Sequence, residues 1–188
     1  VQKIEREAFR NCAALDTVNI SEATTDISPE AFKNCSNLKA INVSKKNSVY
    51  SSVDGYLLSQ NKKTLMIFPP GKANDHFTLL PPSITSIGKF AFYDCKNLKN
   101  ITIPNLVTSI GERAFGLCTN LKTITFLCDQ KIKADSINKE ENKMSFDDGT
   151  QTSHNMFQNI NIQVRKEKLN DYNSDPFYQK FKSIKPSF

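Results

Sequence analysis

One motif recurs four times along this 188-residue chain, and its spacing constrains the fold more than any other feature. The copies share an isoleucine, an Ala-Phe pair, a cysteine, a leucine and an alternating apolar pair, and they start at Ile4, Ile27, Ile87 and Ile110. The first two copies start 23 residues apart, as do the last two. A fixed period of this length is typical of a solenoid of stacked repeats. Such folds present long surfaces rather than one deep pocket, which favours a binding function.

Each copy divides into a short helical turn followed by a strand. In the second copy Ser28-Pro29 suits the start of a helix, and the Ala-Phe pair and the cysteine then fall on one helical face. After them Ile41 and Val43 alternate with small or polar residues, which is the pattern of a strand with one buried face. Neither piece can bury its apolar side alone, so we expect the equivalent residues of neighbouring copies to form one continuous core.

The full pattern, Ile-Gly-x-x-Ala-Phe-x-x-Cys-x-x-Leu-x-x-Ile-x-Ile-Pro, resembles the BspA-type leucine-rich repeat. Residues 84–126 match it almost position for position, and residues 1–43 match it with Glu5 and Ser28 in place of the glycine. The resemblance implies an α/β fold, a right-handed leucine-rich-repeat solenoid. It also implies a secreted or cell-surface, adhesin-like protein of the kind found in bacteria and protists. Its partner would be a host or extracellular-matrix protein such as fibronectin or fibrinogen.

The interval between the second and third copies is irregular. Asp54-Gly55 favours a hairpin turn between alternating apolar residues, and residues 65–69 and 77–81 have the composition of two further strands. We therefore expect one domain over residues 1–188 with four parts: two repeats (1–43), a variant repeat with a hairpin (44–86), two repeats (87–126), and a loop, a degenerate repeat and a cap (127–188).

The C-terminal part is expected to close the end of the solenoid. Residues 134–154 are polar and lack apolar periodicity, which favours a surface loop, and Ile160–Val164 repeats the strand pattern. The spacing of two later groups, Leu169 with Tyr172 and Phe177 with Phe181 and Ile184, predicts two helical segments, the second starting at Asp175-Pro176. Solenoids need such a cap for solubility.

Cysteine usage indicates buried thiols rather than metal ligands or disulfides. Cys12, Cys35, Cys95 and Cys118 occupy one repeat position and should form a column, whereas Cys128 lies outside the register. No Cys-x-x-Cys pair exists, so zinc-ligand spacing is absent. Cysteine packs well as a small buried hydrophobic residue.

No constellation in the sequence predicts an enzyme or a cofactor. The histidines, His76 and His154, lie outside any catalytic motif, and no phosphate-binding loop is present. Asp147-Asp148-Gly149 lacks the alternate acidic positions and closing glutamate of a calcium loop. We therefore expect a protein without catalytic, cofactor or metal sites, and a monomer.

Charge and hydropathy leave several partners open. The net charge of +6, from 25 Lys+Arg and 19 Asp+Glu, permits an anionic partner without requiring one. No apolar run is long enough to span a membrane, so we expect no membrane insertion in this segment. No signal peptide is visible, but Val1–Ile4 aligns with Val107–Ile110. This mid-repeat start leads us to expect further residues before Val1 in the natural protein.

The exposed face of the strands is the candidate binding surface. Two ladders of small polar residues and one ladder rich in lysine are predicted along it, and aromatic residues that could stack on bases are missing, which argues against nucleic acid. The ladders are Thr17/Ala40/Asn100/Thr123, Asn19/Asn42/Thr102/Thr125 and Asp16/Lys39/Lys99/Lys122.

Two interpretations of this surface stay open. In the first, the chain is a protein-binding module, and Lys39, Lys99 and Lys122 contribute to the contact. In the second, the chain is a spacer in a longer repeat array whose binding site lies elsewhere. Separately, a role of the lysines in solubility alone stays open, and the contact would then come from the Thr/Asn ladders or from another site. The hairpin at Tyr50–Tyr56 and the loop 134–154 are alternative contact sites.

Overall fold

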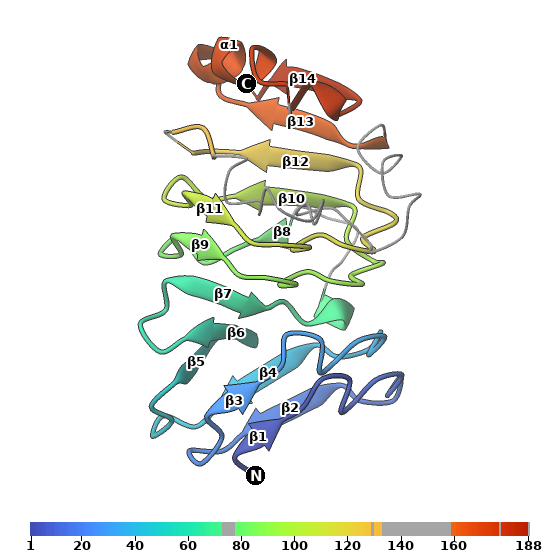
Figure 1. Cartoon of the computed structure of the whole chain (residues 1–188), viewed down its shortest axis with the longest axis vertical. Coiled ribbons are helices and arrows are strands. Elements are labelled where there is room, and N and C mark those ends of the chain that lie inside the picture. The colour runs from blue at the N-terminus through green and yellow to red at the C-terminus, as the bar shows by residue number, and fades with distance from the viewer. Residues whose placement is uncertain (73–77, 129, 133–158, 177, 188) are drawn as a thin grey trace.

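The chain forms an elongated stack of short parallel strands (Figure 1). The computed structural model describes residues 1–72, 78–128, 130–132, 159–176 and 178–187. Each regular repeat contributes a two-residue strand and a four-residue strand, which lie in different sheets. The two-residue strands are β1 (Lys3–Ile4), β3 (Asp26–Ile27), β9 (Ser86–Ile87) and β11 (Ser109–Ile110); the four-residue strands are β2 (Thr17–Ile20), β4 (Ala40–Val43), β10 (Asn100–Ile103) and β12 (Thr123–Phe126).

The register of the strands confirms the repeat period. Ile87 pairs with Ile110, and Ile101 pairs with Ile124, each one period further along the chain. Equivalent residues of adjacent repeats therefore stack directly on each other, as the sequence pattern predicts. The result is the leucine-rich-repeat solenoid expected from the sequence.

The segment between the strands differs from the expected helical turn. It is a series of hydrogen-bonded turns, in which Ala31 N–H donates to Ser28 O (3.0 Å) and Cys35 N–H to Phe32 O (3.1 Å). The residue before each motif cysteine has a positive φ of 59 to 63°, and these residues are Asn11, Asn34, Asp94 and Leu117. A left-handed residue cannot continue an α-helix, so the predicted short helical turn is a set of hydrogen-bonded turns rather than a regular helix.

The core is built from the predicted columns. Phe92 and Phe115 are fully buried and stack with ring centroids 4.9 Å apart and planes 7° from parallel. Phe68 extends the column, with its ring centroid 4.9 Å from that of Phe92. Stacked repeats thus share one wall of aromatic and aliphatic side chains.

The irregular interval contains an inserted hairpin followed by an additional solenoid turn. The hairpin joins β5 (Tyr50–Val53) to β6 (Tyr56–Ser59) through Asp54 and Gly55, whose φ angles are 51° and 79°. Then β7 (Thr64–Ile67) pairs with β9, and β8 (Thr78–Leu79) pairs with β10, with a 3-10 helix at Pro70–Lys72 between them. The predicted hairpin and strand pieces are therefore confirmed.

Strand β6 divides the hydrophobic core into two clusters. Leu57 packs with the N-terminal repeats, whereas Tyr56 and Leu58 pack with the C-terminal ones. The hairpin also interrupts both sheets, because β1 pairs only with β3 and β2 only with β4 among the described residues. In Figure 1 these N-terminal strands, drawn in blue, form the lower end of the stack, with β4 next to the hairpin strands β5 and β6.

The C-terminal cap is partly as predicted. Strand β13 (Asn161–Val164) pairs with β12, a 3-10 helix follows at Lys166–Lys168, and α1 covers Leu169–Asn173. The second predicted helix is wrong, because a 3-10 helix at Tyr178–Lys180 leads into strand β14 (Ser183–Pro186), which pairs with β13. Buried Tyr172 and Tyr178 pack against Phe126, and Phe181 stacks on Tyr178, so that these rings close the core. The predicted loop 134–154 lies outside the described residues.

Candidate binding surface

Four neighbouring strands, β10, β12, β13 and β14, carry the longest polar surface of the candidate face. One ladder along them is Asn100, Thr123, Asn161 and Ser183, and the other is Thr102, Thr125, Gln163 and Lys185. We call these eight residues the polar ladder. Its side chains also bond to one another, since Ser183 Oγ donates to Asn161 Oδ1 (2.8 Å). The surface is therefore partly ordered without a partner.

The predicted lysines are divided between two sheets. Lys122 follows Lys99 in the ladder beside β12 and β10, where the Lys122 N–H donates to Lys99 O (2.8 Å). Lys39 belongs instead to the N-terminal pair of strands, where its N–H donates to Asp16 O (2.7 Å). The three lysines thus do not form one uninterrupted stripe.

The remaining predicted residues lie on that separate N-terminal pair. Thr17 is opposite Ala40 and Asn19 is opposite Asn42, with Asn42 Nδ2 donating to Asn19 Oδ1 (3.3 Å). Thr17, Asn19 and Asn42 are exposed. The structure therefore brings the ladder residues together as two groups rather than as one surface.

Thr125 differs from the other ladder members. Its residue exposure is only 8%, and its Oγ1 donates to Gln163 Oε1 at 2.9 Å. The prediction that Thr125 is an exposed residue is therefore wrong. Its hydroxyl is already hydrogen-bonded to Gln163 on the neighbouring strand β13.

Sequence reasoning missed half of the polar ladder. Asn161 and Gln163 show the same alternation as the earlier strands, but Ser183 and Lys185 lie in a segment whose apolar spacing suits a helix. Lys182 occupies the equivalent position two strands beyond Lys122, because its N–H donates to Ile160 O (3.0 Å); the buried Ile160 stands between the two lysines. Residues 182–185 hold a single apolar residue, Ile184, so the sequence shows no clear strand alternation for β14.

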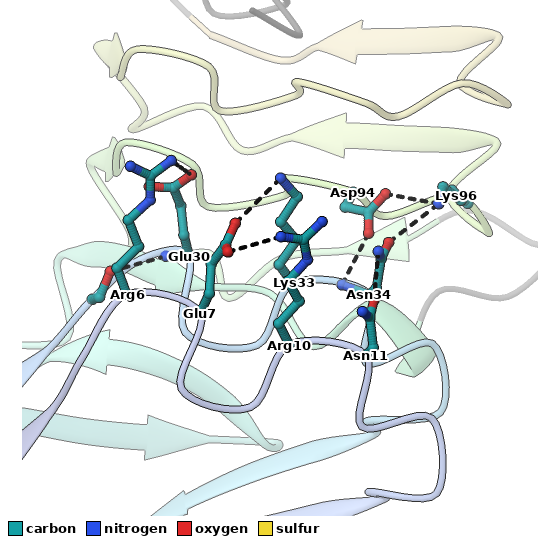
Figure 2. Close-up of polar contacts among 10 residues, drawn as sticks. Arg6, Glu7, Arg10, Asn11, Glu30, Lys33, Asn34, Asp94 and Lys96 are labelled. Carbon is teal, nitrogen blue, oxygen red and sulfur yellow. Dashed lines mark hydrogen bonds and ion pairs between the residues drawn. The ribbon is translucent and has the colours of Figure 1, made fainter.

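The turn side of the solenoid carries a chain of ion pairs and hydrogen bonds (Figure 2). Arg6 bonds Glu30 (3.0 Å), and Glu7 contacts both Arg10 (2.9 Å) and Lys33 (3.5 Å). Each arginine is exposed and its partners are partly exposed, and such solvent-accessible pairs contribute roughly 0–1 kcal/mol each. They define a surface of balanced charge rather than a basic patch.

At the end of this row Asp94 is buried. Its side chain is 1% exposed, its Oδ2 accepts a hydrogen bond from the Asn34 N–H (3.0 Å), and its Oδ1 lies 3.1 Å from Lys96 Nζ. Lys96 also donates to Asn34 Oδ1 (3.3 Å), as Figure 2 shows. A cavity of about 270 Å³ opens beside this cluster, lined by Asn34, Ser36, Pro70, Asp94, Lys96 and Asn97.

A second cavity, of about 380 Å³, lies where the hairpin meets the end of β4. We call it the hairpin cavity, and its lining residues are Val43, Ser44, Lys45, Tyr50, Ser51, Ser52, Gln60 and Lys62. Both cavities adjoin the irregular interval, where the regular stacking of repeats is interrupted.

The cysteines are free, and three of the four column members are buried. Cys118 Sγ donates to Phe92 O (3.0 Å), and Cys35 Sγ donates to Phe9 O (2.9 Å), so each thiol bonds the preceding turn. Cys12 is only half-buried, contrary to the prediction, while Cys128 is buried against Pro104 O (3.3 Å). Burial raises the pKa of Cys95 and Cys118 well above the ordinary thiol value, so these thiols stay protonated.

Metal ligands do not gather in the described part of the chain. No three His, Cys, Asp or Glu side chains there form a group that could hold a metal ion. His76 and His154 lie outside the described residues. None of the described helices has the length and apolar character needed to cross a membrane.

Several solved structures are similar to this chain. A leucine-rich cell-surface protein from Faecalibacterium prausnitzii A2-165 has a TM-score of 0.56 and 22% identity, covering 100% of this chain and 52% of that protein. A leucine-rich repeat protein from Eubacterium ventriosum has 28% identity over 62% of this chain and 37% of its own, with a TM-score of 0.47. The pneumococcal vaccine antigen PcpA has 15% identity, a TM-score of 0.45, and coverage of 93% and 56%. This chain thus spans about a third to just over half of those proteins. No curated protein sequence matches it.

The stacked strands, the aromatic column and the cap define a leucine-rich-repeat solenoid. A model of the BspA-type leucine-rich repeat region matches residues 1–70 and 74–185 in six copies. The chain therefore belongs to the BspA-type leucine-rich repeat family. The six copies agree with the structure, in which β7–β8 and the C-terminal strands add turns to the four regular repeats.

Proposed function

We propose that this chain is a non-enzymatic protein-binding module of a secreted or cell-surface protein. The polar ladder, apart from the buried Thr125, is the surface that holds the partner, and Lys99, Lys122 and Lys182 flank it. The observation that carries the proposal is the alignment of four strands in one register, which presents polar side chains over an uninterrupted sheet.

Membership of the BspA-type family and the likeness to the Faecalibacterium protein, which is described as a cell-surface protein, support the location. A repeat surface of this kind suits a protein partner because it offers many hydrogen-bonding groups over a long area. An extracellular-matrix protein is the partner class that we propose, and lysines at the rim would speed association with an acidic face.

The test compares two variants of equal charge change. The first reverses Lys99, Lys122 and Lys182 to Glu, and the second reverses Lys45, Lys46 and Lys62 at the hairpin. Binding to immobilised fibronectin and fibrinogen is measured at low and moderate salt, with thermal melts to verify folding. We expect the first variant to have a lower association rate constant that depends less on salt concentration. The second variant should bind as the wild type does.

Three results would contradict the proposal. Loss of binding in the hairpin variant alone would move the contact to the hairpin. Unchanged binding in both would exclude the lysines that flank the ladder. No saturable binding of the wild-type chain to a broad panel of matrix proteins would favour the spacer interpretation.

A further inference from the structure

The hairpin cavity exists because the hairpin replaces a regular strand beside β4. A regular neighbour would pair its backbone with β4 along its length. Here the Ile41 N–H donates to Gly55 O (2.8 Å), but the Val43 N–H donates to the side chain of Ser52 (Oγ, 2.9 Å). The hairpin therefore diverges from β4 toward the end of the strand, and the cavity of about 380 Å³ opens there.

Among the residues that the structure describes, two cations and no carboxylate line the cavity. Lys45 and Lys62 are its only charged lining residues, and neither forms an ion pair within the described part of the chain. This contrasts with the turn side of the solenoid, where cations lie beside carboxylates. Two unneutralised ammonium groups at one concave site attract an anion.

The other polar groups of the cavity are held in place and retain hydrogen-bonding capacity. Ser52 Oγ accepts from the Val43 N–H, and Ser44 Oγ accepts from the Lys46 N–H (3.3 Å), so each hydroxyl still has a hydrogen to donate. Gln60 Nε2 donates to Asn47 O (3.0 Å), which leaves the Gln60 carbonyl oxygen as an acceptor. The site thus offers fixed donors and an acceptor beside its two cations.

We propose that the hairpin cavity binds an acidic saccharide unit, a sugar that carries a carboxylate or sulfate group. Lys45 and Lys62 contact the anionic group, while Ser44, Ser52 and Gln60 bond the ring hydroxyls. Sugar hydroxyls both donate and accept, which matches this mixture of groups. The volume lies within the roughly 300–1,000 Å³ of small-molecule sites. An acidic peptide fits less well because Tyr50, the aromatic lining residue, is only 7% exposed and offers little apolar anchor.

The proposal is tested on the whole chain with four probes: a sulfated, uronate-containing disaccharide, a neutral disaccharide of the same size, inorganic sulfate and a tetraglutamate peptide. Affinity is measured by calorimetry, and backbone amide shifts locate the site. We expect saturable binding of the sulfated disaccharide at least tenfold tighter than that of sulfate or the peptide. Shift changes should centre on Ser44, Lys45, Ser52 and Gln60.

Matched variants separate the cavity from general charge. Lys45→Gln with Lys62→Gln should weaken binding of the sulfated disaccharide at least tenfold. Lys46→Gln with Lys63→Gln removes the same charge from adjacent residues that do not line the cavity, and should change the affinity less than twofold. Equal losses in both variants, equal affinity for disaccharide and sulfate, or tighter binding of the peptide would overturn the proposal. None of these residues is in the polar ladder, and the disaccharide assay contains no matrix protein, so this proposal and the proposed function can fail separately.

Discussion

The Asp94 carboxylate accepts a hydrogen bond from the backbone N–H of Asn34, which lies 60 residues earlier in the chain, at 3.0 Å. In regular pairs of repeats the equivalent N–H bonds the backbone of the next turn, as Asn11 does to Lys33 O (3.0 Å) and Asp94 does to Gly116 O (2.8 Å). In the repeat that follows Asn34, the corresponding turn runs through the 3-10 helix at Pro70–Lys72. Among the described residues, no backbone carbonyl of that repeat accepts the bond from the Asn34 N–H. The Asp94 side chain accepts it instead and links the repeats on the two sides of the hairpin.

Replacing Asp94 tests this link. Asp94→Gly leaves the Asn34 N–H without its acceptor but tolerates the positive φ of this position, and an unsatisfied buried donor costs about 1–3 kcal/mol of the free energy of unfolding. Asp94→Asn is the control, because its amide oxygen can accept the bond and asparagine also tolerates the positive φ. Urea denaturation should show the large loss only for glycine. Equal losses in the two variants would mean that the charge, rather than the acceptor, matters.

The aromatic column makes a prediction about the core. Phe115→Ala removes a fully buried ring stacked on Phe92, and should lower the free energy of unfolding by about 3–5 kcal/mol. Phe9 stacks on Phe32 in the first turn but is 36% exposed, so Phe9→Ala should cost less than about half as much. Denaturant melts measure both. A loss below about 1 kcal/mol for Phe115→Ala would contradict the assignment of the column as the core.

Leu117 occupies the position before the motif cysteine with a φ of 59°, where the other repeats have Asn or Asp. A leucine with its branched γ-carbon is strained in this conformation, whereas asparagine adopts it readily. Leu117→Asn should therefore raise the free energy of unfolding by about 0.5–1 kcal/mol. Leu106→Asn, at an exposed residue with an ordinary φ, serves as the control and should change stability by less than about 0.5 kcal/mol. A destabilised Leu117→Asn would show that packing of the leucine outweighs the strain.

The buried thiols give a prediction about pH. Desolvation raises the pKa of Cys95 and Cys118 in the folded protein above the ordinary value of 9.0, so the unfolded chain loses these protons first as pH rises. The free energy of unfolding should then be unaffected by these thiols below about pH 8 and fall progressively above pH 9. Thermal melts of the wild type and of a Cys95→Ala, Cys118→Ala variant, compared from pH 7 to pH 10, measure the difference. A variant with the same alkaline loss as the wild type would exclude the two thiols as its cause.

Alkylation provides an independent measurement of the same burial. Native protein treated with iodoacetamide at pH 8 should be modified at Cys12, which is half-buried, much faster than at Cys35, Cys95 or Cys118. Peptide mass spectrometry identifies the modified sites, and denatured protein is the control. Rapid native modification of Cys118 would contradict the packed column.

The sequence predicts the regular part of the fold because each repeat packs against a neighbour that carries the same motif. Ile101 and Ile124 pair since both occupy the same place in copies one period apart, and the same argument places Phe92 on Phe115. Period, register and buried columns thus follow from the motif without knowledge of distant contacts. The hairpin at Asp54-Gly55 is equally local, because its turn residues favour positive φ.

The candidate surface was less predictable, since it depends on which strands are neighbours. The sequence aligns Lys39 with Lys99 and Lys122, yet the hairpin places Lys39 in a separate sheet. The apolar spacing of Phe177, Phe181 and Ile184 is compatible with a helix. The segment from Ser183 is a strand because β13 offers an unpaired edge, and the hydrogen bonds of that edge outweigh the local preference.

The solenoid, its period and most of its core residues thus follow from the repeated motif, because they depend on contacts between copies of that motif. The features at the interruption come from the three-dimensional arrangement: the division of the core by Leu57 and Leu58, the bond from Asn34 to Asp94, and the cavity between Lys45 and Lys62. An interruption leaves backbone groups and surfaces without their repeat partners. Which distant residues satisfy them depends on geometry that no local pattern contains.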